Sequence, residues 1–266
     1  MAEDAAALLQ AYDAQVRAHV PDRLPDGVRV EREGPLVRTV GLGGSGMIEY
    51  RDLGGIDGPE LDRLIARQVR IFANRGEPFE WKLHAHDRPA DLAQRLRAAG
   101  FVPQDVETVV IALVADVRVT EGAPDGVLLR EVSERVDLER IAELEGAVWQ
   151  TDESSRADRL EEELAADPEG LTIVVAEAGD LVVCAGWVRF PRATEFATLW
   201  GGGTLPGWRG RGIYRALVAH RARLAAQRGR RYLQVDASDE SRPILERLGF
   251  VPVTTTTPFI WSPASR

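Results

Sequence analysis

The sequence has very little cysteine and no long apolar run, and each shortage excludes a class of protein. Cys184 is the single cysteine among 266 residues, which excludes an internal disulfide framework and a cysteine-rich zinc site. It lies in the apolar stretch LVVCAGWVRF, typical of a strand, where we predict a buried and inert thiol. No apolar run approaches the roughly 18 residues that span a bilayer. The N-terminal stretch MAEDAAALLQAYDAQ also carries acidic residues where a secretory signal has basic ones, so we expect a cytoplasmic protein without a membrane partner.

Positive charge is also in short supply. Lysine and arginine number 33 against 42 aspartate and glutamate residues, which gives a formal net charge of −9. Such a surface repels polyanions, so we expect no nucleic-acid partner. A cationic small molecule is easier to accommodate, and a local basic patch can still bind a small anion.

Two segments of the chain resemble each other in order and in detail. LDRLIARQVRIFANRG (61–76) aligns with YRALVAHRARLAAQRG (214–229), with identical residues at six positions. Both have the apolar spacing of a helix and end at a glycine that suits a helix C-cap. A strand candidate follows each, and then a short helix closing in LRAAGFVP (96–103) or LERLGFVP (245–252).

The repeat predicts two domains of mixed α/β order. The stretch ADVRVTEGAPDG (115–126) has the glycine, proline and aspartate of a connector, so we place the boundary between residues 1–118 and 119–266. The second copy is expected to run helix, hairpin, strand, helix, strand, helix, strand. Each copy ends in a run rich in β-branched residues, DVETVVIALV and VTTTTPFIW, which suits a strand.

A glycine-arginine loop precedes the central helix of the second copy. In PGWRGRGIYRALVAH (206–220), Arg209 and Arg211 alternate with Gly210 and Gly212. A glycine-rich turn that enters a helix exposes backbone N–H groups and the positive end of the helix dipole, and arginines add donors suited to phosphate. We predict an anion site here; the alternative is an ordinary strand-to-helix turn with solvated arginines.

This loop resembles the acyl-coenzyme A signature of the GNAT (general N-acetyltransferase) superfamily, which is an Arg or Gln, two residues, Gly, one residue, then Gly or Ala. Arg209 and Gly212 match the first two fixed positions, and Tyr214 departs from the third. The similarity extends over about 127–261, including the strand YLQVD and the closing LERLGF. It implies two GNAT-like domains in tandem, of which the second uses acetyl-CoA as cosubstrate and no metal.

The first copy has no such loop. It reads DLGGIDGPEL, with Asp52, Asp57 and Glu60 near where phosphates would lie, and like charges repel them. We interpret it as a degenerate GNAT-like domain that binds no coenzyme, supports the second copy and walls its substrate cleft.

The resemblance also implies where the coenzyme lies. The pantetheine arm would bond to the backbone at 204–205, the pyrophosphate would lie on 209–214, and the thioester would lie between two splayed strands ending near 200–203 and 235–237. Three successive glycines at 201–203 suit a strand that bulges beside a ligand, or else a kinked strand beside a tight core. The predicted coenzyme-binding residues are Gly203, Thr204, Leu205, Arg209, Gly210, Arg211, Gly212, Ile213 and Tyr214.

Catalytic groups are harder to assign. Family members often have a tyrosine acid four residues before the closing glycine, where this chain has Leu245, and the strand FATLWGGGTL carries no glutamate base. Glu195 stands just before that strand. Asp236 and Ser238 end the next strand, although a turn bond and a helix N-cap would explain them equally. The catalytic candidates are Asp236, Ser238 and Glu195. The expected mechanism is direct attack of the amine on the thioester, either with a water relay for the proton or with a coenzyme thiol that leaves without an acid.

The stretch ELEGAVWQTDESS combines acidic residues with a tryptophan, in the region that commonly covers the acceptor in GNAT proteins. Acids beside an aromatic ring suit an amine cation, so the predicted acceptor residues are Trp149, Asp152 and Glu153. Solvent-facing charges with Trp149 in the core are the alternative. We therefore expect an acetyl-CoA-dependent N-acetyltransferase, monomeric or homodimeric, acting on a small cationic amine; a non-catalytic acyl-CoA-binding or regulatory protein is the alternative.

Two further patterns are interpreted as structural. GLGGSG (41–46) matches a dinucleotide fingerprint, but the following MIEYRDLGG alternates like a strand, which indicates a glycine-rich hairpin. His84 and His86 share a strand face without a set of further metal ligands. We expect both histidines to be ordinary residues of the first copy that line the interface between the copies.

Overall fold

The computed structural model describes residues 4–118 and 122–263. The helices are α1 (Ala5–Gln15), α2 (Gly58–Arg75), α3 (Leu92–Ala98), α4 (Arg135–Trp149), α5 (Arg156–Ala166), α6 (Ile213–Gln227) and α7 (Arg242–Arg247), with 3-10 turns η1 (Val114–Asp116) and η2 (Pro206–Trp208). The strands are β1 (Arg29–Glu33), β2 (Leu36–Val40), β3 (Gly46–Tyr50), β4 (Phe79–His84), β5 (Val102–Pro103), β6 (Glu107–Leu113), β7 (Leu128–Val132), β8 (Leu171–Ala178), β9 (Leu181–Arg189), β10 (Phe196–Thr204), β11 (Tyr232–Ala237) and β12 (Val251–Trp261). Within these residues, no helix combines the length and apolar character needed to cross a membrane.

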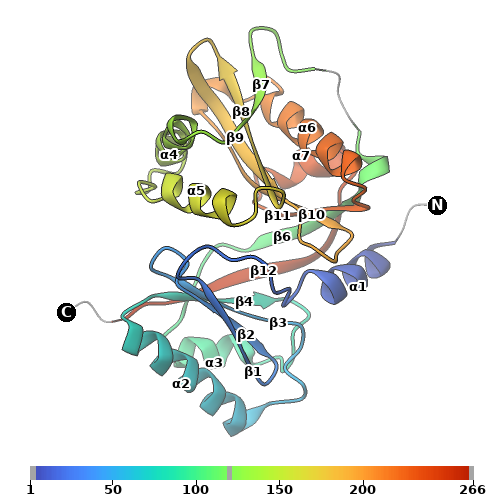
Figure 1. Cartoon of the computed structure of the whole chain (residues 1–266). Helices are drawn as coiled ribbons and strands as arrows, with labels where there is room; N and C mark the ends of the chain where they lie inside the picture. Colours follow the sequence, from blue (N-terminus) through green and yellow to red (C-terminus); the bar gives the residue numbers. More distant parts are fainter. Residues whose placement is uncertain (1–3, 119–121, 264–266) are drawn as a thin grey trace.

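The strands form one mixed sheet that continues through both copies (Figure 1). Its order is β1-β2-β3-β4-β12-β6-β11-β10-β9-β8-β7, with β5 paired to β12. The last strands of the copies are exchanged, because β6 pairs with β11 of the second copy and β12 pairs with β4 of the first. Since β6 and β12 also pair with each other, the sheet is continuous from one copy to the other. The domain boundary at residues 118 and 119 stays a prediction.

The internal repeat predicted from the sequence is present in the element order. Helix α2, strand β4 and helix α3 of the first copy correspond to α6, β11 and α7 of the second. In both copies the strand after the long helix runs parallel to the one before it, β3 with β4 and β10 with β11. Gly76 (φ 68°) and Gly229 (φ 65°) follow the two long helices in the left-handed conformation. The predicted α/β fold with a mixed sheet and two copies of one element order is confirmed.

Helices cover the sheet on both faces. One core packs α6 and α7 against the second copy, another packs α4 and α5 against its opposite face, and a third packs α2 and α3 against the first copy. Helix α1, which we did not predict, covers the central strands through Leu8 and Tyr12. Strand β6 lies between the layers: Val110 faces α6 while Val109 and Ile111 face α1, which explains its continuous apolar run.

The glycine-rich stretch 41–46 forms a turn, as predicted. Strands β2 and β3 pair in antiparallel register on either side of it, and Gly41, Gly43 and Gly44 have positive φ. No helix starts there, so the dinucleotide-binding alternative fails on geometry.

Candidate functional site

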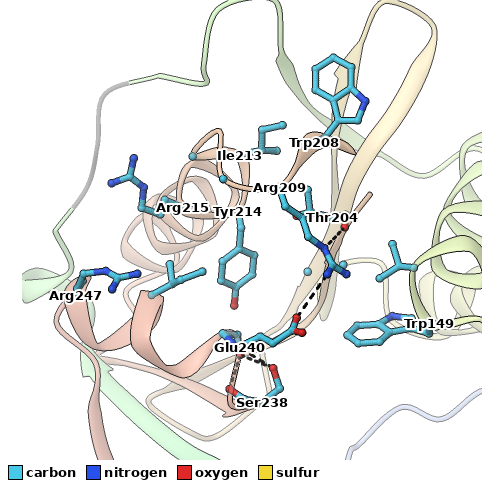
Figure 2. A pocket seen from close by; sticks show the side chains of 17 residues that line it. Trp149, Thr204, Trp208, Arg209, Ile213, Tyr214, Arg215, Ser238, Glu240 and Arg247 are labelled. Carbon is cyan, nitrogen blue, oxygen red and sulfur yellow. Dashed lines mark hydrogen bonds and ion pairs between the residues drawn. The ribbon is translucent and has the colours of Figure 1, made fainter. Parts of the chain in front are cut away.

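The loop between β10 and α6 borders a cavity of about 540 Å³ (Figure 2). Gly210 (φ 75°) and Gly212 (φ 84°) are in the left-handed region, where a side chain is strained. Helix α6 begins at Ile213, and helix geometry leaves the N–H groups of its first turn without partners inside the helix. The cavity therefore meets free donors and the positive end of the α6 dipole.

Three arginines line this cavity, Arg209, Arg215 and Arg247 (Figure 2). The Nε of Arg209 donates to the Thr204 carbonyl at 3.1 Å, and its Nη1 lies 3.9 Å from the carboxylate of Glu240. Arginines beside a helix N-terminus suit phosphate groups. The residues present therefore fit the diphosphate of coenzyme A.

Arg211 does not face the cavity. Its guanidinium stacks on the Trp208 ring, 4.6 Å from the centroid, and donates to the Gly207 carbonyl at 3.1 Å. Of the two alternating arginines, the structure brings only Arg209 to the predicted site, and Arg215 and Arg247 were not identified from the sequence.

Strands β10 and β11 separate next to this loop. They pair in parallel only as far as Thr198 and Gln234, and β10 bulges against β9 between Gly201 and Gly203. Gly202 has φ 102°, and a Cβ on it would lie 2.7 Å from the Tyr214 ring. The predicted splay and bulge are confirmed, and the absence of a side chain lets Tyr214 approach the strand.

A buried arginine holds the bulge in place. Arg221 of α6 is 1% exposed, and its Nη1 donates to the carbonyls of Trp187 at 3.2 Å and Trp200 at 3.0 Å. Burial lowers the pKa of Arg221. The carbonyls beside the bulge therefore have a donor inside the protein, which we did not anticipate from the sequence.

The end of β10 meets the predictions in part. Gly203 and Thr204 line the cavity, but Leu205 does not: its N–H donates to the Val183 carbonyl at 3.0 Å and its side chain packs into the core. Its amide N–H is already bonded within the protein, which corrects its place in the predicted set. Cys184 is fully buried, accepts a hydrogen bond from Thr204 at 3.2 Å and has its pKa raised to about 11 by burial, as expected of an inert thiol.

A second cavity, of about 450 Å³, adjoins the first and lies where the two copies meet. The two cavities share Trp149, Gly202, Tyr214, Ser238 and Ser241. The first copy contributes Met47, Glu80, Lys82 and Glu107 to the second cavity. The first copy therefore walls this cleft, as expected from the sequence.

Two of the three predicted catalytic residues lie at these cavities. Asp236 lines the second cavity, forms an ion pair with Lys82 of the first copy and accepts a hydrogen bond from Gln234 at 2.7 Å. Ser238 lines both cavities, and its Oγ accepts the Ser241 N–H at 3.3 Å, so it has the turn role weighed above.

Glu195 is not near either cavity. It precedes the N-terminal end of β10, whereas the cavities lie at the C-terminal end of that strand. There it accepts a hydrogen bond from Gln15 at 3.0 Å and lies 3.6 Å from Arg231. Its position gives it no contact with a thioester held at the bulge.

The predicted acceptor residues divide in the same way. Trp149 is 53% exposed and lines both cavities, so it is not a core residue. Asp152 and Glu153 line neither; Asp152 accepts the Ser154 N–H at 3.0 Å, and Glu153 pairs with Arg156 at 2.8 Å. Glu145, which the sequence placed in the same group, does line the second cavity.

Tyr214 is positioned at the junction of the cavities. Its hydroxyl points from α6 toward the turn at Ser238 (Figure 2), and burial raises its pKa. Leu245, which stands where the family often has its tyrosine, is fully buried in the core. A tyrosine on a different helix therefore reaches this part of the site.

Of the two histidines of the first copy, His84 is buried and His86 is partly exposed. His84 is within 3.2 Å of the Tyr12 hydroxyl, and His86 is within 3.0 Å of Thr254 on β12, so His86 does line the interface between the copies. Among residues 4–118 and 122–263, no group of three or more potential ligands could hold a metal ion.

Comparisons with known proteins agree with this geometry. Residues 138–250 match the acetyltransferase (GNAT) family. A GCN5-related N-acetyltransferase from Kribbella flavida is 18% identical over 98% of this chain and 95% of its own, with a TM-score of 0.65. A tandem GNAT protein from the clavulanic acid biosynthesis pathway is 14% identical over 98% and 95%, with a TM-score of 0.63. A functionally unknown conserved protein from Staphylococcus epidermidis is 12% identical over 95% and 97%, with a TM-score of 0.66. No curated protein matches the sequence.

Proposed function

We propose that this protein transfers an acetyl group from acetyl-CoA directly to the amine of a small cationic molecule, because residues 138–250 match the acetyltransferase (GNAT) family. The observation that carries the proposal is the continuity of the two cavities through Tyr214 and Ser238. One cavity offers donors for phosphates, and the other offers carboxylates for a cation. A coenzyme and an amine could therefore meet at the splayed strands.

The diphosphate of the coenzyme is assigned to the start of α6. The backbone N–H groups of residues 210–214 and the positive end of the α6 dipole are assigned to the phosphates, and Arg209 and Arg215 add positive charge. Acetyl-CoA supplies a thioester whose carbonyl carbon an amine attacks with release of the thiol. Strand β10 pairs with β11 only as far as Thr198 and bulges against β9 between Gly201 and Gly203, and we assign the β10 backbone N–H groups beyond Thr198 to hold the developing oxyanion.

Tyr214 is assigned as the proton donor to the departing sulfur. Its hydroxyl lies at the junction of the cavities. A tyrosine hydroxyl is protonated at neutral pH, and burial raises the pKa of Tyr214 further. The amine itself attacks only as the neutral form, and carboxylates of the second cavity are near enough to accept its proton.

Acetyl-CoA calorimetry combined with a thiol-release assay on an amine panel tests the proposal. Arg215→Ala should weaken coenzyme binding about 10- to 100-fold, since a hydrogen bond to a charged group contributes about 1.5–3 kcal/mol. Arg211→Ala is the matched control, because that side chain stacks on Trp208 outside the cavity. Absence of coenzyme binding would refute the proposal, and binding without thiol release for any amine would favour a non-catalytic acyl-CoA-binding protein.

A further inference from the structure

The cleft between the two copies is lined by carboxylates from both. In the second cavity these are Glu80, Glu107, Glu145 and Asp236. A smaller cavity, of about 200 Å³, continues it beneath α1 and adds Glu49 of β3. The two cavities share Met47, Lys82, Trp200, Gln234 and Asp236, and together we name them the acidic groove.

The cations of the acidic groove are already paired within the protein. The pairs are Lys82 with Asp236, Arg156 with Glu145, Arg17 with Asp87, and Arg189 with Glu163. Glu49, Glu80 and Glu107 remain, and no side-chain hydrogen bond or ion pair joins their carboxylates to another residue in the described part of the chain. All three are supplied by the first copy.

Unpaired carboxylates in a buried groove favour a positive ligand. Burial raises the pKa of Glu49 and Glu107 to about 7 and raises that of Glu80. Neighbouring acids add to each shift, and the nearby charge of Lys82 opposes it without cancelling it. Ionised carboxylates without a partner are unfavourable there, and a bound cation would restore their charged form.

A separate feature also indicates a ligand in this groove. Trp187 lines the second cavity and is 3% exposed, and its indole N–H has no hydrogen-bond partner within the described residues. A buried donor without an acceptor is unfavourable by about 1–3 kcal/mol. A hydrogen-bond acceptor atom of a bound molecule would satisfy it, whereas an ammonium group, which only donates, would not.

The unpaired carboxylates lie at different ends of the groove. Thr108 is in register with Ala237, which places the adjacent Glu107 beside Ser238, where the two large cavities join. Across β12, Glu107 is opposite Thr256 and Glu80 is opposite Ile260, so their Cα atoms are separated by on the order of 15 Å. A molecule with two positive groups, one for each end of the groove, suits this spacing better than a molecule with a single positive group.

We propose that the acetyl acceptor binds in the acidic groove and carries two positive groups, a reactive amine beside Glu107 and a second cation held by Glu80 and Glu49. This inference rests on the proposed acetyl transfer. The reactive ammonium gives one proton to the Glu107 carboxylate, and its nitrogen then bonds to the acetyl carbon. The carbon–sulfur bond breaks as the sulfur takes a proton from Tyr214, and the second proton that the nitrogen must lose returns to the Tyr214 oxygen, which leaves a neutral amide and a free thiol. The first copy is then a substrate-binding domain for the second.

Matched amines test this inference. Thiol release is measured with acetyl-CoA and α,ω-diamines of three to eight carbons, each against the monoamine of equal length. We expect at least one diamine to have a kcat/KM tenfold or more above its monoamine. Glu80→Gln should raise the diamine KM five- to tenfold and leave the monoamine and coenzyme affinity unchanged. Glu60→Gln, on the exposed face of α2, is the control variant.

The outcomes separate the inference from the proposed function. If coenzyme binds but diamines and monoamines react equally, or no diamine reacts, the dication proposal is overturned while coenzyme binding stands. An unchanged diamine KM in a folded Glu80→Gln variant also overturns it. Failure of coenzyme to bind the wild type overturns the proposed function itself.

Discussion

Adding one methyl group at the bulge of β10 should disturb both stability and the coenzyme site. In Gly202→Ala, the new Cβ meets the Tyr214 ring at 2.7 Å, and the residue keeps φ 102°, which side chains rarely adopt. Backbone strain of this kind amounts to about 1–3 kcal/mol, and displacing a packed ring adds about 1–3 kcal/mol. We expect a loss of about 2–5 kcal/mol in the free energy of unfolding.

Two other glycines separate the contributions. Gly179 has φ 59° with open space around its Cβ position, so Gly179→Ala reports strain without a clash and should lose about 1 kcal/mol. Gly207 has neither a positive φ nor a close neighbour, so Gly207→Ala should stay within about 0.5 kcal/mol of wild type. In a Tyr214→Ala background, Gly202→Ala should cost less stability than in the wild type, because the clash with the ring is removed.

Denaturant unfolding without coenzyme measures the free energy of unfolding of each variant, and calorimetry measures its affinity for acetyl-CoA. For a chain of this size about 1 kcal/mol shifts Tm by roughly 2–4 °C, so Gly202→Ala should melt at least 4 °C lower. We also expect its coenzyme affinity to fall, because the displaced ring lies at the junction of the cavities. Equal losses for Gly202→Ala and Gly179→Ala, or an undiminished loss for Gly202→Ala in the Tyr214→Ala background, would refute the role assigned to this contact.

Three further predictions concern side chains around the same site. Tyr214→Phe should lower kcat by about 10- to 1,000-fold with little change in acetyl-CoA affinity, measured by steady-state thiol release and calorimetry. Burial raises the pKa of Glu107 from 4.5 to about 7, so folding takes up a proton between these values and stability falls as pH rises from about 4.5 to 7. Glu107→Gln should flatten that part of the denaturation profile and unfold at higher denaturant than wild type above pH 7. Arg221→Met should lose about 2–4 kcal/mol in denaturant unfolding, because the carbonyls of Trp187 and Trp200 are left without their donor.

The sequence predicted those parts of the fold that local patterns determine. Apolar spacing and a terminal glycine located α2 and α6, and the bulge followed from the consecutive glycines at 201–203. Helix α1, strand β7 and helix α5 were not anticipated. The exchange of β6 and β12 was also not anticipated, since alternation and β-branching identify a strand but not its neighbour.

Side-chain direction limited the prediction of the site. Alternating arginines in a loop give no period that distinguishes Arg209, which lines the cavity, from Arg211, which stacks on Trp208. The groove residues had a detectable signal, because Glu80 and Lys82 alternate with Phe79 and Trp81 in one strand. Two charges on the same face of a strand between apolar residues indicate a polar, partly buried surface. That these residues lie close to Asp236 could be recognised only from the long-range pairing of the strands.

The exchanged end strands have a consequence for the evolution and engineering of this chain. A gene cut between the repeats would yield two fragments, each with the terminal strand that the other requires and with a bare hydrogen-bonding edge where that strand belongs. Neither fragment could persist as a finished unit, and coexpression would favour reassembly. The two copies are therefore bound to each other by architecture, because each sheet is completed by the end strand of the other copy.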